Sequence, residues 1–87
     1  MHAVVVTVTI SDHEVAEGHL RENVVPGVSQ APGFVAGYWT RKQSRGVGIV
    51  IFESEDAAQA IAETIPSMVP DMVTLVGVDV LDVVARA

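Results

Sequence analysis

Four short runs of β-branched and aromatic residues punctuate this chain of 87 residues, and their order constrains the fold more than any other feature. The runs lie at residues 3–10, 34–41, 47–53 and 73–84. Valine, isoleucine, threonine and aromatic residues favour extended strands, so each run predicts a β-strand. Only residues 42–46 separate the second run from the third, and this short polar gap predicts an antiparallel hairpin.

The segment between the first two runs has the pattern of a helix. Ser11 or Asp12 can cap its start, because a short polar side chain can accept a hydrogen bond from the free N–H groups of the first turn. Pro26 lies inside the helical pattern, and its missing N–H predicts a kink or break near Asn23–Val25. Apolar residues recur at three- or four-residue spacing through the segment and predict one buried stripe: Ala16, Leu20, Val24, Val28 and Ala31.

A second helix is predicted after the hairpin. Ser54 provides its cap, an alanine-rich stretch follows, and we expect the helix to end at Ile65–Pro66. Gly77 predicts a bulge in the last strand. The order is therefore β-α-β-β-α-β, which is typical of an α+β ferredoxin-like domain with a four-stranded antiparallel sheet. The length corresponds to a single domain over residues 1–87.

Charge and composition exclude several classes of protein. The net charge is −6, so the phosphates of a nucleic acid would be repelled. Arg41, Lys42 and Arg45 form a short basic spot, which we interpret as a solvated turn. The chain has no cysteine, which excludes disulfides, thiolate nucleophiles and thiolate metal ligands.

The first apolar run is not a targeting or membrane segment. It lacks the basic start and the small-residue cleavage site of a signal peptide. No stretch approaches the roughly 18–20 apolar residues that a membrane-spanning helix needs. We therefore expect no membrane association and a cytoplasmic location.

Both faces of the predicted sheet are apolar. In the third strand, Val47, Ile49 and Ile51 lie on one face, and Val50 and Phe52 lie on the other. Two helices can cover only one of these faces. Hydrophobic residues make up 49% of this small chain, so apolar surface remains for a partner. A second copy supplies a self-complementary cover, and we expect a homodimer that forms through the sheet.

Two joints in the sequence resemble those of a known superfamily. Ala31-Pro32-Gly33-Phe34 leads from a helix directly into a strand, and Phe52-Glu53-Ser54-Glu55-Asp56-Ala57 leads from a strand into a capped helix. Both resemble the dimeric α+β barrel superfamily, and most of all its antibiotic biosynthesis monooxygenase group. The resemblance covers nearly the whole chain. It implies that the sheets of two protomers close into a barrel, with a ligand cleft between the sheet and the helices of each protomer.

The chain also departs from the enzymes of that superfamily. Haem-degrading relatives place a histidine on the second helix, whereas here no histidine follows His19. Oxygenating relatives have a longer segment before the last strand that is rich in aromatic residues and histidine. Here that segment runs only from Ile65 to Met72 and contains no aromatic residue. Both differences weaken the case for catalysis.

A small apolar pocket is expected beside Pro26, because a kinked helix cannot lie flush on a twisted sheet. Candidates for proton transfer or substrate orientation are His19, Tyr38 and Trp39. Tyr38 and Trp39 are adjacent in a strand and must point to opposite faces, and either can instead serve only in packing. The residues expected to bind a ligand are Leu20, Asn23, Val24, Trp39, Met68 and Met72.

Two functions follow as hypotheses. The first is a homodimeric α+β barrel protein that binds a small molecule or serves as an accessory module. The alternative is a cofactor-independent monooxygenase that acts on a small aromatic or polyketide-like compound. His2, His13 and His19 lack the spacing of a metal site, and no glycine-rich phosphate loop is present. We therefore expect no metal, haem or flavin.

Overall fold

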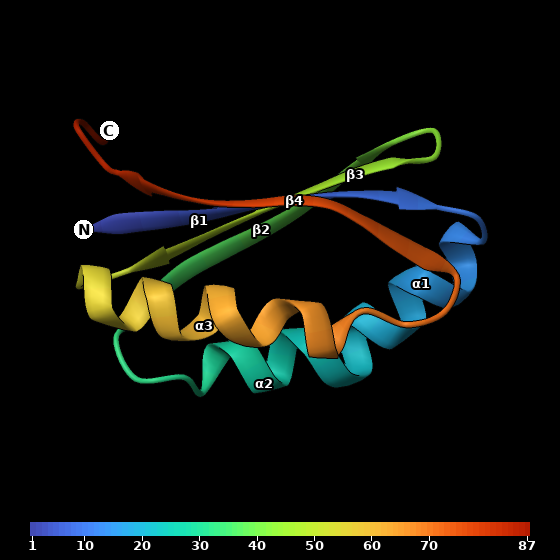
Figure 1. The fold of residues 1–87 in the computed structure, drawn as a ribbon, viewed down its shortest axis with the longest axis horizontal. Helices are drawn as coiled ribbons and strands as arrows, with labels where there is room; N and C mark the ends of the chain where they lie inside the picture. The colour runs from blue at the N-terminus through green and yellow to red at the C-terminus, as the bar shows by residue number, and fades with distance from the viewer.

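The computed structural model describes all residues, 1–87, and shows one sheet with helices on a single face (Figure 1). The helical layer lies entirely below the sheet in this view, and both termini lie at the same end of the molecule. The order confirms the predicted ferredoxin-like α+β fold. The elements are β1 (His2–Ile10), α1 (His13–His19), the π-helical segment η1 (Leu20–Val24), α2 (Val25–Ser29), β2 (Phe34–Lys42), β3 (Arg45–Phe52), α3 (Glu55–Met68) and β4 (Val73–Asp82).

The four strands are antiparallel and lie in the order β2-β3-β1-β4. The predicted hairpin joins β2 to β3, and its register places Trp39 opposite Gly48. The predicted bulge in β4 is also present. Thr7 pairs with Gly77 and Val8 pairs with Leu75, so β4 has one extra residue between two consecutive residues of β1.

The first α-helix is interrupted near the predicted place, but it does not break: a π-helical turn over Leu20–Val24 joins α1 to α2. The N–H of Val25 donates to the carbonyl of Leu20, five residues earlier. Asp12 caps α1 through a hydrogen bond from the N–H of Val15, as predicted. Pro26 then lies in the first turn of α2, where a missing N–H costs little. The wider turn therefore absorbs the disruption that the proline introduces.

The predicted end of the second helix at Ile65–Pro66 is wrong, because α3 continues to Met68. Pro66 removes one N–H, but the two hydroxyls of this turn bond backwards to helix carbonyls. Thr64 donates to Ala60 at 3.0 Å and Ser67 donates to Thr64 at 2.7 Å. These bonds stabilise a final turn beyond the proline. Ser54 caps the helix start as predicted.

The last strand is shorter than the predicted range of 73–84. It ends at Asp82, which pairs with His2, the first residue of β1. Since β1 is the only neighbour of β4, the ladder ends where β1 begins. The third strand begins at Arg45 rather than at residue 47, because the hairpin turn is tighter than expected.

The core lies between the sheet and the helices. Five apolar residues from β1, α2, β3 and α3 are buried together: Val4, Val28, Val50, Phe52 and Ala58. The rings of Phe34 and Phe52 contact each other edge to face, with centroids 6.2 Å apart and an interplanar angle of 78°. Such pairs stabilise a core beyond their buried area. No helix of the protein is long and apolar enough to cross a membrane.

The other face of the sheet carries no helix (Figure 1). Its register places Tyr38 beside Ile49 and Ile49 beside Val5, so three apolar side chains from adjacent strands form one row. Tyr38 is 65% exposed, Ile49 is 36% exposed, and Leu81 on β4 is 50% exposed. We refer to this surface, with Tyr38, Ile49, Val5 and Leu81, as the open face.

Candidate functional site

A cavity with a volume of about 180 Å³ lies between the first helical segment and the sheet. Hydrophobic residues make up 14 of the 21 that line it, so its interior suits an apolar ligand. The sheet contributes Val6 and Val8 of β1 and Trp39 of β2. The helical side contributes Leu20 and Val24 of η1. The cavity is apolar and lies between the first helical segment and the sheet; Val24 and Val28 line it, whereas Pro26 itself does not.

The connection from α3 to β4 closes one side of this cavity. Met68, Val69 and Pro70 all line it. On the sheet side, Gly46 and Gly48 are buried and bring only backbone to the wall. A Cβ atom at Gly46 would lie 2.9 Å from Val8, so the close packing of the Val8 side chain over this residue requires glycine.

His19 reaches across the cavity wall and makes two hydrogen bonds. Its Nε2 lies 3.4 Å from the carbonyl oxygen of Met68, and its Nδ1 lies 3.3 Å from Nδ2 of Asn23. The carbonyl of Met68 can only accept a hydrogen bond, so Nε2 is the donor in that contact. Both bonds are long and therefore weak. Both ring nitrogens of His19 are therefore engaged in contacts with the protein.

The remaining candidates lie outside the cavity. Asn23 is exposed and reaches it only through His19. Met72 does not line it, although its carbonyl accepts hydrogen bonds from both the N–H and the hydroxyl of Ser11. Tyr38 lies on the open face. The structure thus gathers His19, Leu20, Val24, Trp39 and Met68 around one space.

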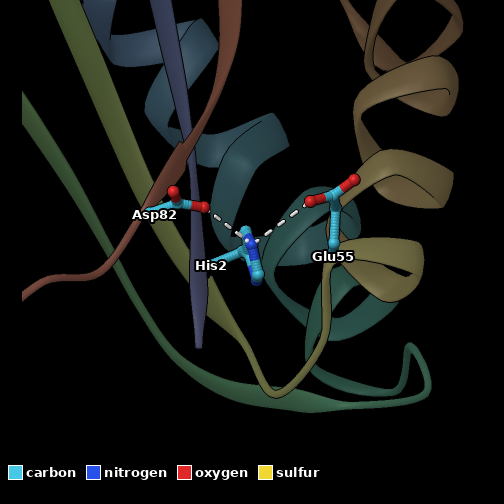
Figure 2. A group of neighbouring side chains, drawn as sticks. All are labelled: His2, Glu55 and Asp82. Carbon is cyan, nitrogen blue, oxygen red and sulfur yellow. Dashed lines mark ion pairs between the residues drawn. The ribbon is translucent and has the colours of Figure 1, made fainter.

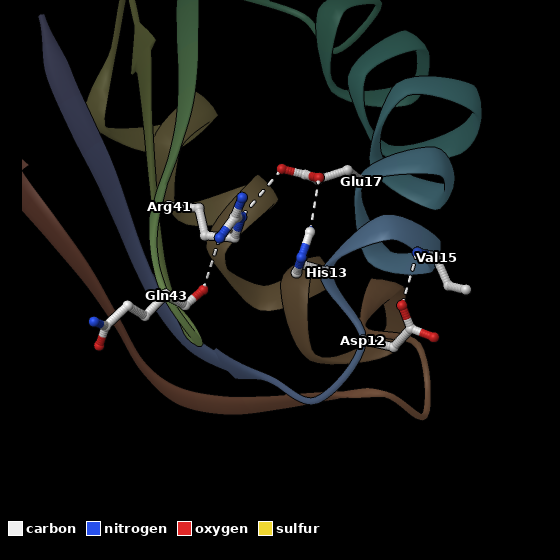
Figure 3. Close-up of polar contacts among 6 residues, drawn as sticks. All are labelled: Asp12, His13, Val15, Glu17, Arg41 and Gln43. Atoms are coloured by element: carbon white, nitrogen blue, oxygen red, sulfur yellow. Dashed lines mark hydrogen bonds and ion pairs between the residues drawn. The ribbon is translucent and has the colours of Figure 1, made fainter.

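An ion pair between α1 and β2 forms the polar rim of the cavity (Figure 3). Arg41 Nε lies 3.2 Å from Glu17 Oε1, and Arg41 also donates to the carbonyl of Gln43 at 3.0 Å. His13 Nδ1 lies 3.5 Å from the other oxygen of Glu17. The hydrogen bond from Arg41 holds the pKa of the Glu17 carboxyl below its ordinary value of 4.5, and His13 adds to this effect. Sequence analysis missed this pair, because 24 residues separate its members.

The lowered pKa of Glu17 predicts a specific pH dependence of stability. The native state favours the ionised carboxylate, so the ion pair contributes fully above pH 4.5 and loses its contribution as the pH falls through the folded-state pKa. We therefore expect Glu17→Gln to destabilise the protein at pH 6 and to have a smaller effect at pH 3. Urea unfolding of both proteins at the two pH values measures the difference. An equal effect at both pH values would contradict the prediction.

A second polar cluster lies at the opposite end of β1 (Figure 2). His2 Nε2 lies 2.9 Å from Asp82 Oδ1 and 3.5 Å from Glu55 Oε2. These atoms are close enough to share a metal ion, and the sequence did not indicate this grouping. Both carboxylates are largely exposed, and the buried Nδ1 of His2 has no hydrogen-bond partner. A metal-bound histidine normally donates from its second nitrogen, so the cluster fits an ion-pair network better than a metal centre.

Comparisons with known proteins identify the fold. No family model matches the chain, and no curated protein matches its sequence. Among solved structures, the haem-degrader MhuD from Mycobacterium tuberculosis with two haems bound has a TM-score of 0.58 and 21% identity, over 97% of this chain and 98% of that one. A point mutant of MhuD with two manganese protoporphyrin IX molecules bound per active site has a TM-score of 0.66 and 17% identity, over 100% and 98%.

A third solved structure is the monooxygenase ActVA-Orf6 of Streptomyces coelicolor in complex with nanaomycin D. It has a TM-score of 0.56 and 18% identity, and the match covers 99% of this chain and 88% of that one. This chain shares the ferredoxin-like α+β fold of these three structures. Identities of 17–21% establish the architecture alone.

Proposed function

We propose that this protein is a homodimer that binds a small apolar molecule in the cavity of each protomer. The observation that carries the proposal is the cavity itself, which is largely apolar and has a volume of about 180 Å³. A dry apolar cavity of about 150 Å³ is large enough to bind benzene. The cavity is therefore suited to a compound of one or two rings.

Haem is a poor match for this cavity. The two MhuD structures contain haem or a manganese porphyrin, and a porphyrin has four pyrrole rings joined in one macrocycle. Such a ligand is far larger than benzene, so most of it would lie outside the volume of about 180 Å³. The histidine nearest the cavity, His19, already bonds to Met68 and Asn23. These features favour a small organic ligand over a haem.

The alternative is a cofactor-independent monooxygenase that acts on a small aromatic compound. Two observations support it: Trp39 and His19 line the same cavity, and ActVA-Orf6 is a monooxygenase of the same fold. In such a reaction a phenol and molecular oxygen give a quinone and water, so the substrate itself supplies the electrons. His19 would then accept the phenol proton through a ring nitrogen released from its contact with the protein.

The two functions make different predictions for 1-naphthol. Both predict that Trp39 fluorescence changes as 1-naphthol is added and reaches a plateau when the cavity is fully occupied. Trp39 is the only tryptophan and lines the cavity. Binding without oxygen consumption at an oxygen electrode would support the binding module. Oxygen consumption that His19→Ala reduces by about 100-fold, the lower range for a general base, would support the monooxygenase. His2→Ala is the control, because His2 lies at the opposite end of β1 and does not line the cavity. No change in emission would contradict both functions.

The open face supports the homodimer. Its exposed apolar side chains include Tyr38 on β2, Ile49 on β3 and Leu81 on β4. Monomeric proteins rarely leave a surface of this kind uncovered. Asp79 of β4 pairs with Val5 and is the one charged side chain that the central part of this face carries. A second copy would present the same apolar rows and cover them.

A further inference from the structure

Trp39 is held between two glycines on the cavity side of the sheet. A Cβ atom built on Gly37 would lie 2.8 Å from Cη2 and 2.9 Å from Cζ3 at the benzene end of the indole. A Cβ atom built on Gly48 would lie 3.0 Å from Cδ1 and 3.2 Å from Nε1 at the pyrrole end. Both ends of the indole therefore occupy the space where side chains would otherwise stand.

This arrangement determines how the indole lies. Gly48 is opposite Trp39 in the β2–β3 register, and Gly37 precedes Trp39 by two residues on the same face. Contacts at both ends and on both edges of the ring system mean that the indole lies along the sheet rather than standing away from it. One ring face is therefore directed at the strand backbones, and the other is directed at the cavity that Trp39 lines.

We infer that Gly37 and Gly48 determine ligand shape specificity, because they hold Trp39 flat and make its ring face a wall of the cavity. A flat wall accepts a planar ring in full contact, whereas a globular molecule of the same size touches it at few points. Stacked aromatic pairs gain roughly two- to twelvefold in affinity beyond the effect of buried area. The preferred ligand is thus a planar compound of one or two rings. This inference rests on the proposed binding function.

The test compares two alcohols of ten carbons each, planar 1-naphthol and globular 1-adamantanol. Isothermal titration calorimetry with the intact protein gives both affinities without relying on tryptophan emission. We expect 1-naphthol to bind about tenfold more tightly, in line with the stacking contribution. In Gly48→Ala the new methyl group would displace the pyrrole end of the indole, so this preference should fall to about twofold or less.

Two further variants separate shape selection from damage to the fold. Gly18→Ala is the matched control, since a Cβ atom there meets nothing within 4 Å, and its preference should equal that of the natural protein. Trp39→Leu removes the flat wall without adding an atom to either glycine, and it should also lose the preference. Circular dichroism and gel filtration establish that each variant keeps its fold.

The outcomes distinguish this inference from the proposed function. If neither alcohol binds, the proposed binding function itself fails. If both bind equally well to the natural protein, the binding function stands and the shape selection is refuted. If the preference survives in folded Gly48→Ala, the glycines do not determine it. Loss of the preference in both Gly48→Ala and Trp39→Leu, with Gly18→Ala unchanged, supports the inference.

Discussion

Replacing Ile49 with aspartate is expected to eliminate the dimer. Ile49 lies on the open face between Val5 and Tyr38, and a second copy would bury it. An aspartate there would be a buried charge without a partner, which costs at least several kcal/mol. Gel filtration with light scattering at micromolar concentration should give twice the 9.2 kDa chain mass for the natural protein, and a 9.2 kDa monomer or an aggregate for Ile49→Asp.

Val15→Asp is the matched control for this experiment. Val15 is also a β-branched residue and is 50% exposed, but it lies on α1 rather than on the open face. An aspartate in the first turn of a helix is favourable, so this variant should keep both the fold and the dimer. If the natural protein is a folded monomer of 9.2 kDa, the proposed dimer is wrong. A dimeric Ile49→Asp would instead exclude the open face as the interface.

Phe52→Ala is expected to have the largest effect on stability. Phe52 is fully buried in the core and contacts Phe34 edge to face. Truncation of a buried phenylalanine typically costs about 3–5 kcal/mol of stability. The variant loses the free energy of burying the ring, and the cavity that remains destabilises it further. Domains of this kind have total stabilities of about 5–15 kcal/mol, so the variant should be close to unfolding at room temperature.

Urea unfolding followed by circular dichroism measures this loss. Protein concentration must be equal in all samples, because dimerisation adds to the apparent stability. Val84→Ala is the control: Val84 is 93% exposed, and the change should stay within about 0.5 kcal/mol of the natural protein. A loss below about 1 kcal/mol for Phe52→Ala would mean that the core does not pack as described.

Local interactions explain the parts of the fold that could be predicted from the sequence. Asp12 and Ser54 cap helices through hydrogen bonds that span three residues, so their effect is visible in a short stretch of sequence. Pro26 disrupts its helix through its own missing N–H. The apolar stripe through Leu20 and Val24 likewise indicated which side of the helix meets the sheet, and hence two walls of the cavity. Each of these predictions rests on neighbours within one helical turn.

Only the tertiary structure shows which side chains far apart in the sequence come into contact. Alternation placed Tyr38 and Trp39 on opposite faces, but only the packing of the helices on one face decided that Trp39 lines the cavity. The ion pair of Glu17 with Arg41 joins a helix to a strand 24 residues away. The His2 cluster unites both ends of the chain with the start of α3. Such contacts require the chain to close long loops, and no pattern of local spacing encodes which side chains then meet.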